Sequence, residues 1–272
     1  MFGNAENGSV TFDGVTMHYM KCGSGRRYLI VLPGLADGLT TVEGKALLLA
    51  PAYKDFYDDF TVFLFSRRDS LPEGFTIEDM AEDQAKAMRA LGIGRACVLG
   101  VSQGGMVAQA LAAAHPNKVR RLVLAVTAPY ANPTVRACVE GWIRMAEAGD
   151  HKALMADTAE HTYTERYLRF YRLLYPALGI GKPADYSRFL VNARAILGFD
   201  AREDLHKITC PTLILGGAKD QTVGVETSGE LHRLIPQSSL HIYPECGHAP
   251  YDEEKGFYRE VYEYLMLRTE NN

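Results

Sequence analysis

The sequence has no excess of basic residues and no long apolar run. Lys and Arg number 29 and Asp and Glu number 33, so the net charge is −4, and the basic residues are scattered along the chain. Phosphate contacts need a clustered basic surface, so we expect no nucleic-acid partner. A membrane helix needs ~18 consecutive apolar residues, whereas the longest candidate run, residues 46–50, is stopped by Pro51. We therefore expect no membrane partner.

Cysteine is also sparse, and residues 1–16 contain no Lys, no Arg and no apolar stretch of the kind that marks a secretory signal. A dispersed, odd number of cysteines without a CxxC pair is typical of reduced thiols in a cytosol. We predict a cytoplasmic protein that needs no metal and no other cofactor, with its oligomeric state left open. The cysteines are Cys22, Cys97, Cys138, Cys210 and Cys246.

The overall composition is that of a folded globular protein. Hydrophobic residues make up 47% and charged residues 23% of the 272 residues. These fractions exclude a disordered chain, a collagen and a coiled coil as descriptions of the whole. The length allows one large domain or two small ones.

Short apolar runs recur along most of the chain. Runs of this length that stop at Gly, Pro or polar residues predict buried strands of a parallel sheet. Before them, residues 9–22 alternate around Asp13-Gly14, which predicts a hairpin. The predicted buried strands are residues 28–32, 61–65, 96–101, 122–126, 212–215 and 239–243.

Helices are predicted between these strands. Thr76 can cap a helix that has Asp79 at its third position. Residues 104–115 are rich in Ala and Leu and end at Pro116, and residues 253–267 carry apolar side chains at helical spacing. Because strands alternate with helices, we predict an α/β fold, a mostly parallel central sheet with helices on both faces.

The alternation stops between residues 130 and 205, where β-branched runs are almost absent. We predict that residues 130–205 form a helical insertion and that residues 1–129 and 206–272 together form one core domain. Helices of the insertion are expected to open at Asn132-Pro133 and Asp150, a third to close at Pro176, and a fourth to begin at Pro183.

The sharpest local pattern is Gly100-Val101-Ser102-Gln103-Gly104, which matches G-x-S-x-G between a predicted strand and a predicted helix. In this nucleophile elbow the chain turns sharply at the serine, and small neighbours let the backbones approach. The serine oxygen then stands near a helix N-terminus, which favours negative charge. We predict that Ser102 is a nucleophile. The alternative is a glycine-rich turn with an idle serine.

A serine nucleophile needs a histidine base, and the base needs an acid that orients it. In this type of elbow the acid follows the serine and the histidine comes last. His248 follows Gly247 directly after a predicted strand, where open α/β sheets place their sites, whereas its closest rival, His241, lies inside that strand. Asp220 also follows a strand and precedes His248. The predicted catalytic triad is Ser102, Asp220 and His248.

The reaction also needs an oxyanion hole. One backbone N–H donor is expected from Gln103, the residue after the nucleophile. The other is expected from the loop after the first parallel strand, residues 33–38, and Leu35 is the predicted donor.

Together these residues resemble the α/β-hydrolase superfamily. The resemblance covers nearly the whole chain and is strongest at residues 28–38, 92–126 and 208–252. The stretch at residues 91–109, which contains the elbow, is similar to the esterase, enol-lactonase and carbon–carbon hydrolase branch. The resemblance implies that the helical insertion is a mobile cap over the site.

The chain departs from that family at two places. It has Pro33-Gly34 where the family often has His-Gly, which leaves a backbone donor intact. It has Ser66-Arg67-Arg68-Asp69 where the family often has Asp-x-Arg-Gly, and the sequence offers no physical account of this change. Because the elbow carries a serine, the branches with an Asp nucleophile are disfavoured.

The predicted function is that of an enzyme, a serine hydrolase that cleaves a small or medium carboxylic ester through an acyl-enzyme on Ser102. The expected partner is a small, ester-like molecule. The same triad would serve an enol-lactone or a carbon–carbon bond beside a ketone. An alternative from another class is a ligand-binding or receptor protein on the same fold, with a slow triad.

Aromatic residues are concentrated in the insertion, which leads us to expect an apolar cleft with few charges between the insertion and the core. Half or more of these rings are expected to pack inside the insertion itself. The residues predicted to contact substrate are Trp142, Tyr163, Tyr167 and Tyr171.

Overall fold

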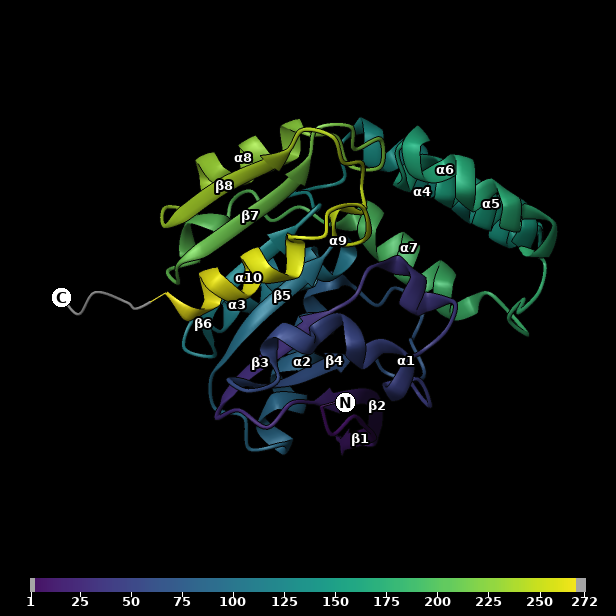
Figure 1. Ribbon diagram of the computed structural model, residues 1–272. Coiled ribbons are helices and arrows are strands. Elements are labelled where there is room, and N and C mark those ends of the chain that lie inside the picture. The colour runs from purple at the N-terminus through teal and green to yellow at the C-terminus, as the bar shows by residue number, and fades with distance from the viewer. Residues whose placement is uncertain (1–2, 268–272) are drawn as a thin grey trace.

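The computed structural model describes residues 3–267, and a twisted sheet runs through the centre of this part of the chain (Figure 1). The sheet has eight strands in the order β1-β2-β4-β3-β5-β6-β7-β8. Their bounds are β1 Glu6–Phe12, β2 Val15–Cys22, β3 Arg27–Leu32, β4 Phe60–Phe65, β5 Ala96–Val101, β6 Val119–Ala125, β7 Thr212–Gly217 and β8 Ser238–Tyr243.

The strands β3 to β8 are parallel to one another, and β1 and β2 add an antiparallel edge beside β4. The register aligns Leu32 of β3 with Gly100 of β5 and aligns Val101 with Ala125 of β6. These strands therefore end at the same edge of the sheet, and the loops that follow them meet there. The mostly parallel α/β fold predicted from the sequence is confirmed.

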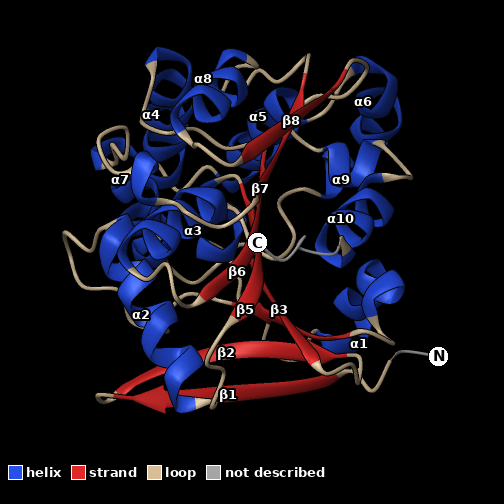
Figure 2. Ribbon diagram, turned by 90° about the vertical axis from the view of Figure 1, so that its left-hand side faces the viewer, coloured by secondary structure: helices blue, strands red, loops and turns tan. Residues whose placement is uncertain are grey.

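Helices cover both faces of the sheet (Figure 2). Buried side chains alternate along the central strands: Ile30 and Val98 belong to one apolar cluster, and Val31 and Leu99 to the other. This alternation along each strand is what a sheet packed on both faces requires.

The helices are α1 Ala46–Leu49, α2 Ile77–Ala90, α3 Gln103–Ala114, α4 Pro133–Glu147, α5 His151–Thr162, α6 Glu165–Tyr171, α7 Ser187–Gly198, α8 Glu226–Leu234, α9 Pro250–Glu253 and α10 Phe257–Met266. The 3₁₀ turns are η1 Leu35–Gly38, η2 Ala50–Phe56, η3 Arg172–Ala177 and η4 Leu205–Lys207.

Two local predictions are confirmed by backbone geometry. Asp13 and Gly14 both have positive φ, 48° and 74°, as the tight turn of the β1–β2 hairpin requires. At the start of α2 the Thr76 hydroxyl accepts a hydrogen bond from the Asp79 N–H, and the Asp79 carboxylate accepts one from the Thr76 N–H. This capping box supplies partners for two otherwise free donors at the helix end.

Residues 130–205 are helical, as predicted, but two of the expected boundaries are wrong. Asn132 and Asp150 cap α4 and α5 through their side chains. Pro176 lies inside η3 instead of closing a long third helix. Pro183 lies in the connection ahead of α7, whose first residue is Ser187. In Figure 1 α4, α5 and α6 lie together at one end of the molecule. We call residues 130–205 the helical segment.

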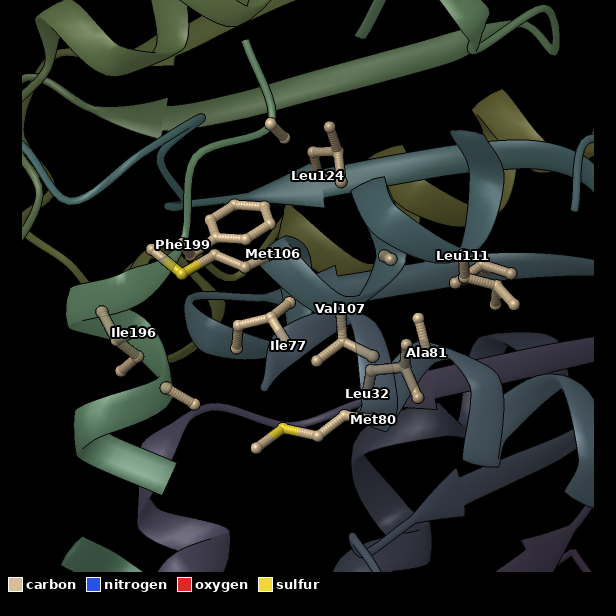
Figure 3. Close-up of a cluster of buried hydrophobic side chains, with 14 of the residues drawn as sticks. Leu32, Ile77, Met80, Ala81, Met106, Val107, Leu111, Leu124, Ile196 and Phe199 are labelled. Carbon is tan, nitrogen blue, oxygen red and sulfur yellow. The ribbon is translucent and has the colours of Figure 1, made fainter. Parts of the chain in front are cut away.

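The last helix of this segment, α7, packs on the core. Figure 3 shows Ile196 and Phe199 beside Ile77 of α2 and Met106 of α3, and all four belong to one buried apolar cluster. At the other end of the same helix, a Cβ placed on Gly38 would lie 2.9 Å from the Phe189 Cα atom. Helix α7 is therefore held against both α2–α3 and the loop after β3.

The elbow between β5 and α3 depends on two glycines. A Cβ at Gly104 would collide with the Leu32 carbonyl oxygen, and one at Gly100 would lie 2.7 Å from the Ala108 Cβ atom. The backbone of the elbow packs directly against the backbone at the end of β3, and only glycine, which has no Cβ atom, allows so close a contact. This packing sets α3 directly against the end of β3.

Substitution of Gly104 by Ala is expected to destabilise the protein by about 1–3 kcal/mol, because a methyl group has no space beside the Leu32 carbonyl. The matched control is Gly229→Ala in α8, where a Cβ meets no atom within 4 Å. That change should be neutral or stabilising by up to about 1 kcal/mol. Urea unfolding measures both, and equal effects at the two glycines would contradict the close-packing explanation.

Candidate active site

Ser102 stands at the turn between β5 and α3 with φ 53° and ψ −121°. A positive φ is uncommon for a residue with a side chain, and such strain concentrates at functional sites. Two neighbours hold the turn. The Ser102 N–H donates to the Ala125 carbonyl at 2.9 Å, and the Thr127 hydroxyl donates to the Ser102 carbonyl at 2.7 Å. The strand β6 and the residues after it therefore support the serine backbone.

The structure brings Ser102, His248 and Asp220 into one hydrogen-bonded chain. The Ser102 Oγ atom lies 2.9 Å from His248 Nε2, and His248 Nδ1 lies 2.8 Å from Asp220 Oδ2. His248 is 5% exposed and Asp220 is 8% exposed. Because an ionised carboxylate can only accept, Nδ1 carries the proton and Nε2 is free to accept from the serine hydroxyl.

Backbone donors hold the second oxygen of the Asp220 carboxylate. Asp220 Oδ1 accepts from the Thr222 N–H at 2.8 Å and from the Val223 N–H at 3.0 Å. These bonds satisfy the buried carboxylate and fix the direction in which Oδ2 points. The rival His241 lies on β8 and bonds Glu260 at 2.6 Å on the partly exposed surface, away from this chain.

The two predicted oxyanion donors are both first residues of helices. Leu35 opens η1 and Gln103 opens α3, so neither N–H has a partner within its own helix. The two elements are adjacent, since a Cβ at Gly34 would lie 3.4 Å from Ser102 Cβ. The starts of η1 and α3 therefore both lie close to Ser102.

A buried arginine connects these two elements, and it lies within residues 66–69, the stretch in which the chain departs from the family pattern. Arg67 follows β4, and its guanidinium donates to Gln103 Oε1 at 3.1 Å and to the Gly34 carbonyl at 3.4 Å. Its backbone N–H donates to Asp37 Oδ2 at 3.0 Å. Burial lowers the pKa of Arg67 to about 10, while Asp37 acts against that shift.

Helix α7 of the helical segment joins the same network. Arg188 donates to Asp37 Oδ2 at 2.8 Å and to the Arg67 carbonyl at 3.0 Å. Gln103 Nε2 donates to the Asn192 carbonyl at 2.7 Å. The expectation of few charges between the segment and the core is therefore wrong at α7, because these charges satisfy one another and the backbone. Sequence reasoning did not select Asp37 and Arg67 as functional residues. Both follow the ends of predicted strands, and this position is the signal that could have identified them.

Of the four predicted substrate contacts, Trp142 packs within the helical segment. It is 6% exposed, its indole N–H donates to Asp157 Oδ2 at 2.9 Å, and its ring meets His161 edge-on at 6.4 Å. The Cys138 side chain and then Asp157 raise the pKa of His161 to about 9. Trp142 also belongs to the apolar cluster that α4 shares with the core.

The other three aromatic residues line an open cavity of about 530 Å³. Tyr163 stacks on Tyr167 at 5.0 Å and lies 5.4 Å from Tyr171. The Tyr163 hydroxyl donates to Asp252 Oδ2 at 2.9 Å, and burial raises the pKa of both groups. Within the described residues, the cavity lining includes neither Ser102 nor His248. Because Asp252 of α9 lines the cavity, the cavity lies beside the loop that carries His248.

No three His, Cys, Asp or Glu side chains among residues 3–267 come together as metal ligands. In the same residues, no helix combines the length and the apolar character that crossing a membrane would require.

The sheet order, the serine elbow and the Ser–His–Asp chain define an α/β hydrolase. A model of the family described as the alpha/beta hydrolase fold matches residues 29–255. The chain belongs to this family and is a hydrolase, which confirms the family resemblance and the enzyme class inferred from the sequence.

Named relatives lie within the same family. A protein of Caulobacter sp. (strain K31) called "Putative carbamate hydrolase RutD" is 29% identical over 248 residues, 83% of this chain and 85% of its own. Among solved structures, the α/β-hydrolase enzyme MGS-M2 from a Medee basin deep-sea metagenome library matches with a TM-score of 0.86 and 20% identity, covering 97% of this chain and 99% of its own. The enol-lactonase from Burkholderia xenovorans LB400 matches with a TM-score of 0.83 and 20% identity, covering 96% and 100%.

Substitution of Asp37 by Asn is expected to destabilise the protein by ~3–5 kcal/mol, because it removes the buried carboxylate that faces the buried Arg67 guanidinium and the partly buried Arg188 guanidinium. The control is Glu147→Gln, which breaks the exposed pair with Arg194 and should cost less than about 1 kcal/mol. Urea unfolding compares the two. A loss at Asp37 no larger than that at Glu147 would contradict the buried network.

Proposed function

We propose that the protein is a serine hydrolase that cleaves small or medium carboxylic esters through an acyl-enzyme on Ser102. The observation that carries this proposal is the hydrogen-bonded chain from the half-buried Ser102 Oγ through the buried His248 to the buried Asp220. A serine hydroxyl is a weak nucleophile until such a base takes its proton. The strained backbone at Ser102 supports the same assignment.

The reaction begins when Ser102 Oγ attacks the ester carbonyl carbon and its proton passes to His248 Nε2. Asp220 stabilises the imidazolium and keeps the ring oriented. Hydrogen bonds from the N–H groups of Leu35 and Gln103 stabilise the negative charge that develops on the carbonyl oxygen. The intermediate collapses, the C–O bond breaks, and Nε2 returns the proton to the departing alcohol.

The acyl group then remains on Ser102 until water removes it. His248 Nε2 takes a proton from the water, whose oxygen attacks the acyl carbon, and the same two N–H groups receive the charge. When the bond to Ser102 Oγ breaks, His248 returns the proton to that oxygen and the carboxylic acid leaves. No metal or cofactor takes part in these steps.

The proposed substrate class rests on the apolar side chains that the core shares with the helical segment, beside the charged contacts of Arg188. The cluster that contains Leu35 and Met106 continues into α4 and α7 of the helical segment, which we propose as the cap. An apolar cleft between core and cap favours a small or medium acyl or aryl group over a sugar. We retain Tyr163, Tyr167 and Tyr171 as proposed substrate contacts at the approach to the site.

A second candidate is a carbamate, because relatives from Caulobacter sp. (strain K31) and Caulobacter segnis carry the name "Putative carbamate hydrolase RutD". A carbamate carbonyl accepts the same nucleophile, and the leaving group would take its proton from His248 in the same way. An enol-lactone is a third possibility, supported by the fold of the Burkholderia enol-lactonase. All three react through Ser102, so substrate comparison separates them and labelling of the serine does not.

The proposed setting is a reducing cytoplasm. All five cysteines are free and buried in the described chain, and buried unpaired thiols are common in proteins of a reducing compartment. Burial raises the pKa of Cys22 to about 12 and that of Cys97 to about 11. Thiols of this kind are poorly reactive and would persist in that compartment.

An organophosphonate is expected to label the protein once, on the peptide that carries Ser102, because among the described residues only this serine bonds a histidine whose other ring nitrogen bonds a carboxylate. Replacement of Ser102 or His248 by Ala should lower ester turnover by a factor on the order of 10⁴–10⁶, and the double variant should lose little more. Intact-protein mass and kinetics measure both effects. Absence of an adduct together with no turnover of any ester, carbamate or lactone would favour a ligand-binding protein.

Acyl-chain length is expected to change kcat/KM in a series of p-nitrophenyl esters from acetate to palmitate. Each buried methylene is worth ~0.8 kcal/mol, so kcat/KM should rise over the first few carbons and then fall where the cleft is closed by the cap. A flat profile, or a preference for palmitate, would contradict the closed cleft and indicate an open groove.

A further inference from the structure

The end of α5 contacts both loops that carry the partners of Ser102. The His161 carbonyl accepts a hydrogen bond from the Thr222 hydroxyl at 3.1 Å, two residues after Asp220. The Thr162 carbonyl accepts one from the backbone N–H of His248 at 2.8 Å. Residues 161–164 of the helical segment therefore contact both the acid loop and the histidine loop, while Asn132 and Cys138 of the same segment contact the acid loop alone.

Glu253 joins the same place from the other side. It lies in α9, directly after the histidine loop. Its Oε2 atom accepts from the Gly247 N–H at 2.7 Å, and its Oε1 atom accepts from both the N–H and the hydroxyl of Thr164 at 2.7 Å each. One carboxylate thus links the residue before His248 to the helical segment. Hydrogen bonds to an ionised carboxylate are stronger than those between neutral groups.

The consequence for His248 is geometric. The N–H groups of two consecutive residues, Gly247 and His248, are fixed to the segment, the first through Glu253 and the second directly by Thr162. Two fixed peptide groups determine the direction in which the His248 side chain leaves the backbone. Gly247 has to be glycine here, because a Cβ would lie 2.7 Å from the Thr162 carbonyl oxygen.

We propose that Glu253 is a positioning residue that makes the orientation of His248 depend on the helical segment being seated on the core. This inference rests on the proposed function of His248 as the base. When residues 162–164 move away, Glu253 loses both Thr164 donors and His248 loses its backbone acceptor. The base is then aligned with Ser102 only in the closed arrangement, so that closure of the cap and activation of the serine are one event.

A role of this kind affects the chemical step more than substrate binding. Glu253→Ala is expected to lower kcat about 10–100-fold, since small misplacements of a catalytic group cost factors of that size. KM should change less than kcat, because Glu253 does not contact the proposed cleft. Glu253→Gln keeps a single acceptor oxygen for two sets of donors and should be intermediate. Thr164→Val removes the hydroxyl donor alone and should be milder still.

The matched control is Glu254→Ala. Glu254 is the next residue in the chain and is exposed, and it bonds only the Gly256 N–H of its own loop among the described residues. Its loss should leave kcat near that of the wild-type protein. Because the two changes remove the same charge from adjacent positions, a general electrostatic effect would appear in both variants.

A spectroscopic measurement tests the position of His248 without any substrate. The proton shared by His248 Nδ1 and Asp220 should give a far-downfield proton NMR signal in the wild-type protein and in Glu254→Ala. In Glu253→Ala the signal should broaden or shift, while the melting temperature shows that the protein is folded. If Glu253→Ala does not fold, Thr164→Val takes its place in both measurements.

The outcomes separate this inference from the proposed function. If Glu253→Ala and Glu254→Ala share the wild-type kcat and NMR signal, Glu253 does not position His248. If no variant or wild-type protein hydrolyses any ester or reacts with the phosphonate, the proposed function fails, and the NMR signal still decides whether Glu253 fixes the imidazole. A larger effect on KM than on kcat would assign Glu253 to substrate binding instead.

Discussion

The close contact between the elbow and the end of β3 is the constraint on which the site depends. Gly104 lies against the Leu32 carbonyl with no room for a side chain. This contact places α3 directly beside the loop after β3, and the two helix starts at Leu35 and Gln103 come to lie close to Ser102. A site that stabilises a developing charge needs donors fixed before the reaction begins. Backbone packing provides that rigidity here.

The helical segment holds the two halves of the site by different means. At α7 a buried network that includes Arg188 and Asp37 holds the loop of the proposed oxyanion donors. At the end of α5, hydrogen bonds from Thr164 and to Thr162 hold the loop of the histidine. Burying charged groups is unfavourable unless they are paired. The polar contacts therefore define one seated position of the segment, which apolar packing alone would leave less specific.

Several features of the fold could be predicted because they depend on neighbouring residues. The Thr76 capping box and the Asp13-Gly14 turn are local hydrogen-bond and backbone preferences. The helix boundary expected at Pro183 was wrong because the start of α7 depends on tertiary packing and not on neighbouring residues. Proline is compatible with the first turn of a helix but does not start one, and packing of α7 against the core decides where that helix begins.

The sequence by itself determined the succession of strands and helices along the chain, the elbow at Ser102, and the positions of His248 and Asp220 after strands. Periodicity and turn chemistry, on which these features depend, are local properties. Only the tertiary structure decided which polar residues support them. Arg188 contacts Arg67, which lies far away in the sequence, and Glu253 contacts Thr164 in the same long-range way. No spacing in the sequence specifies such pairs. Their contacts follow from the strand order and from the path of the helical segment, which place distant residues within hydrogen-bond distance.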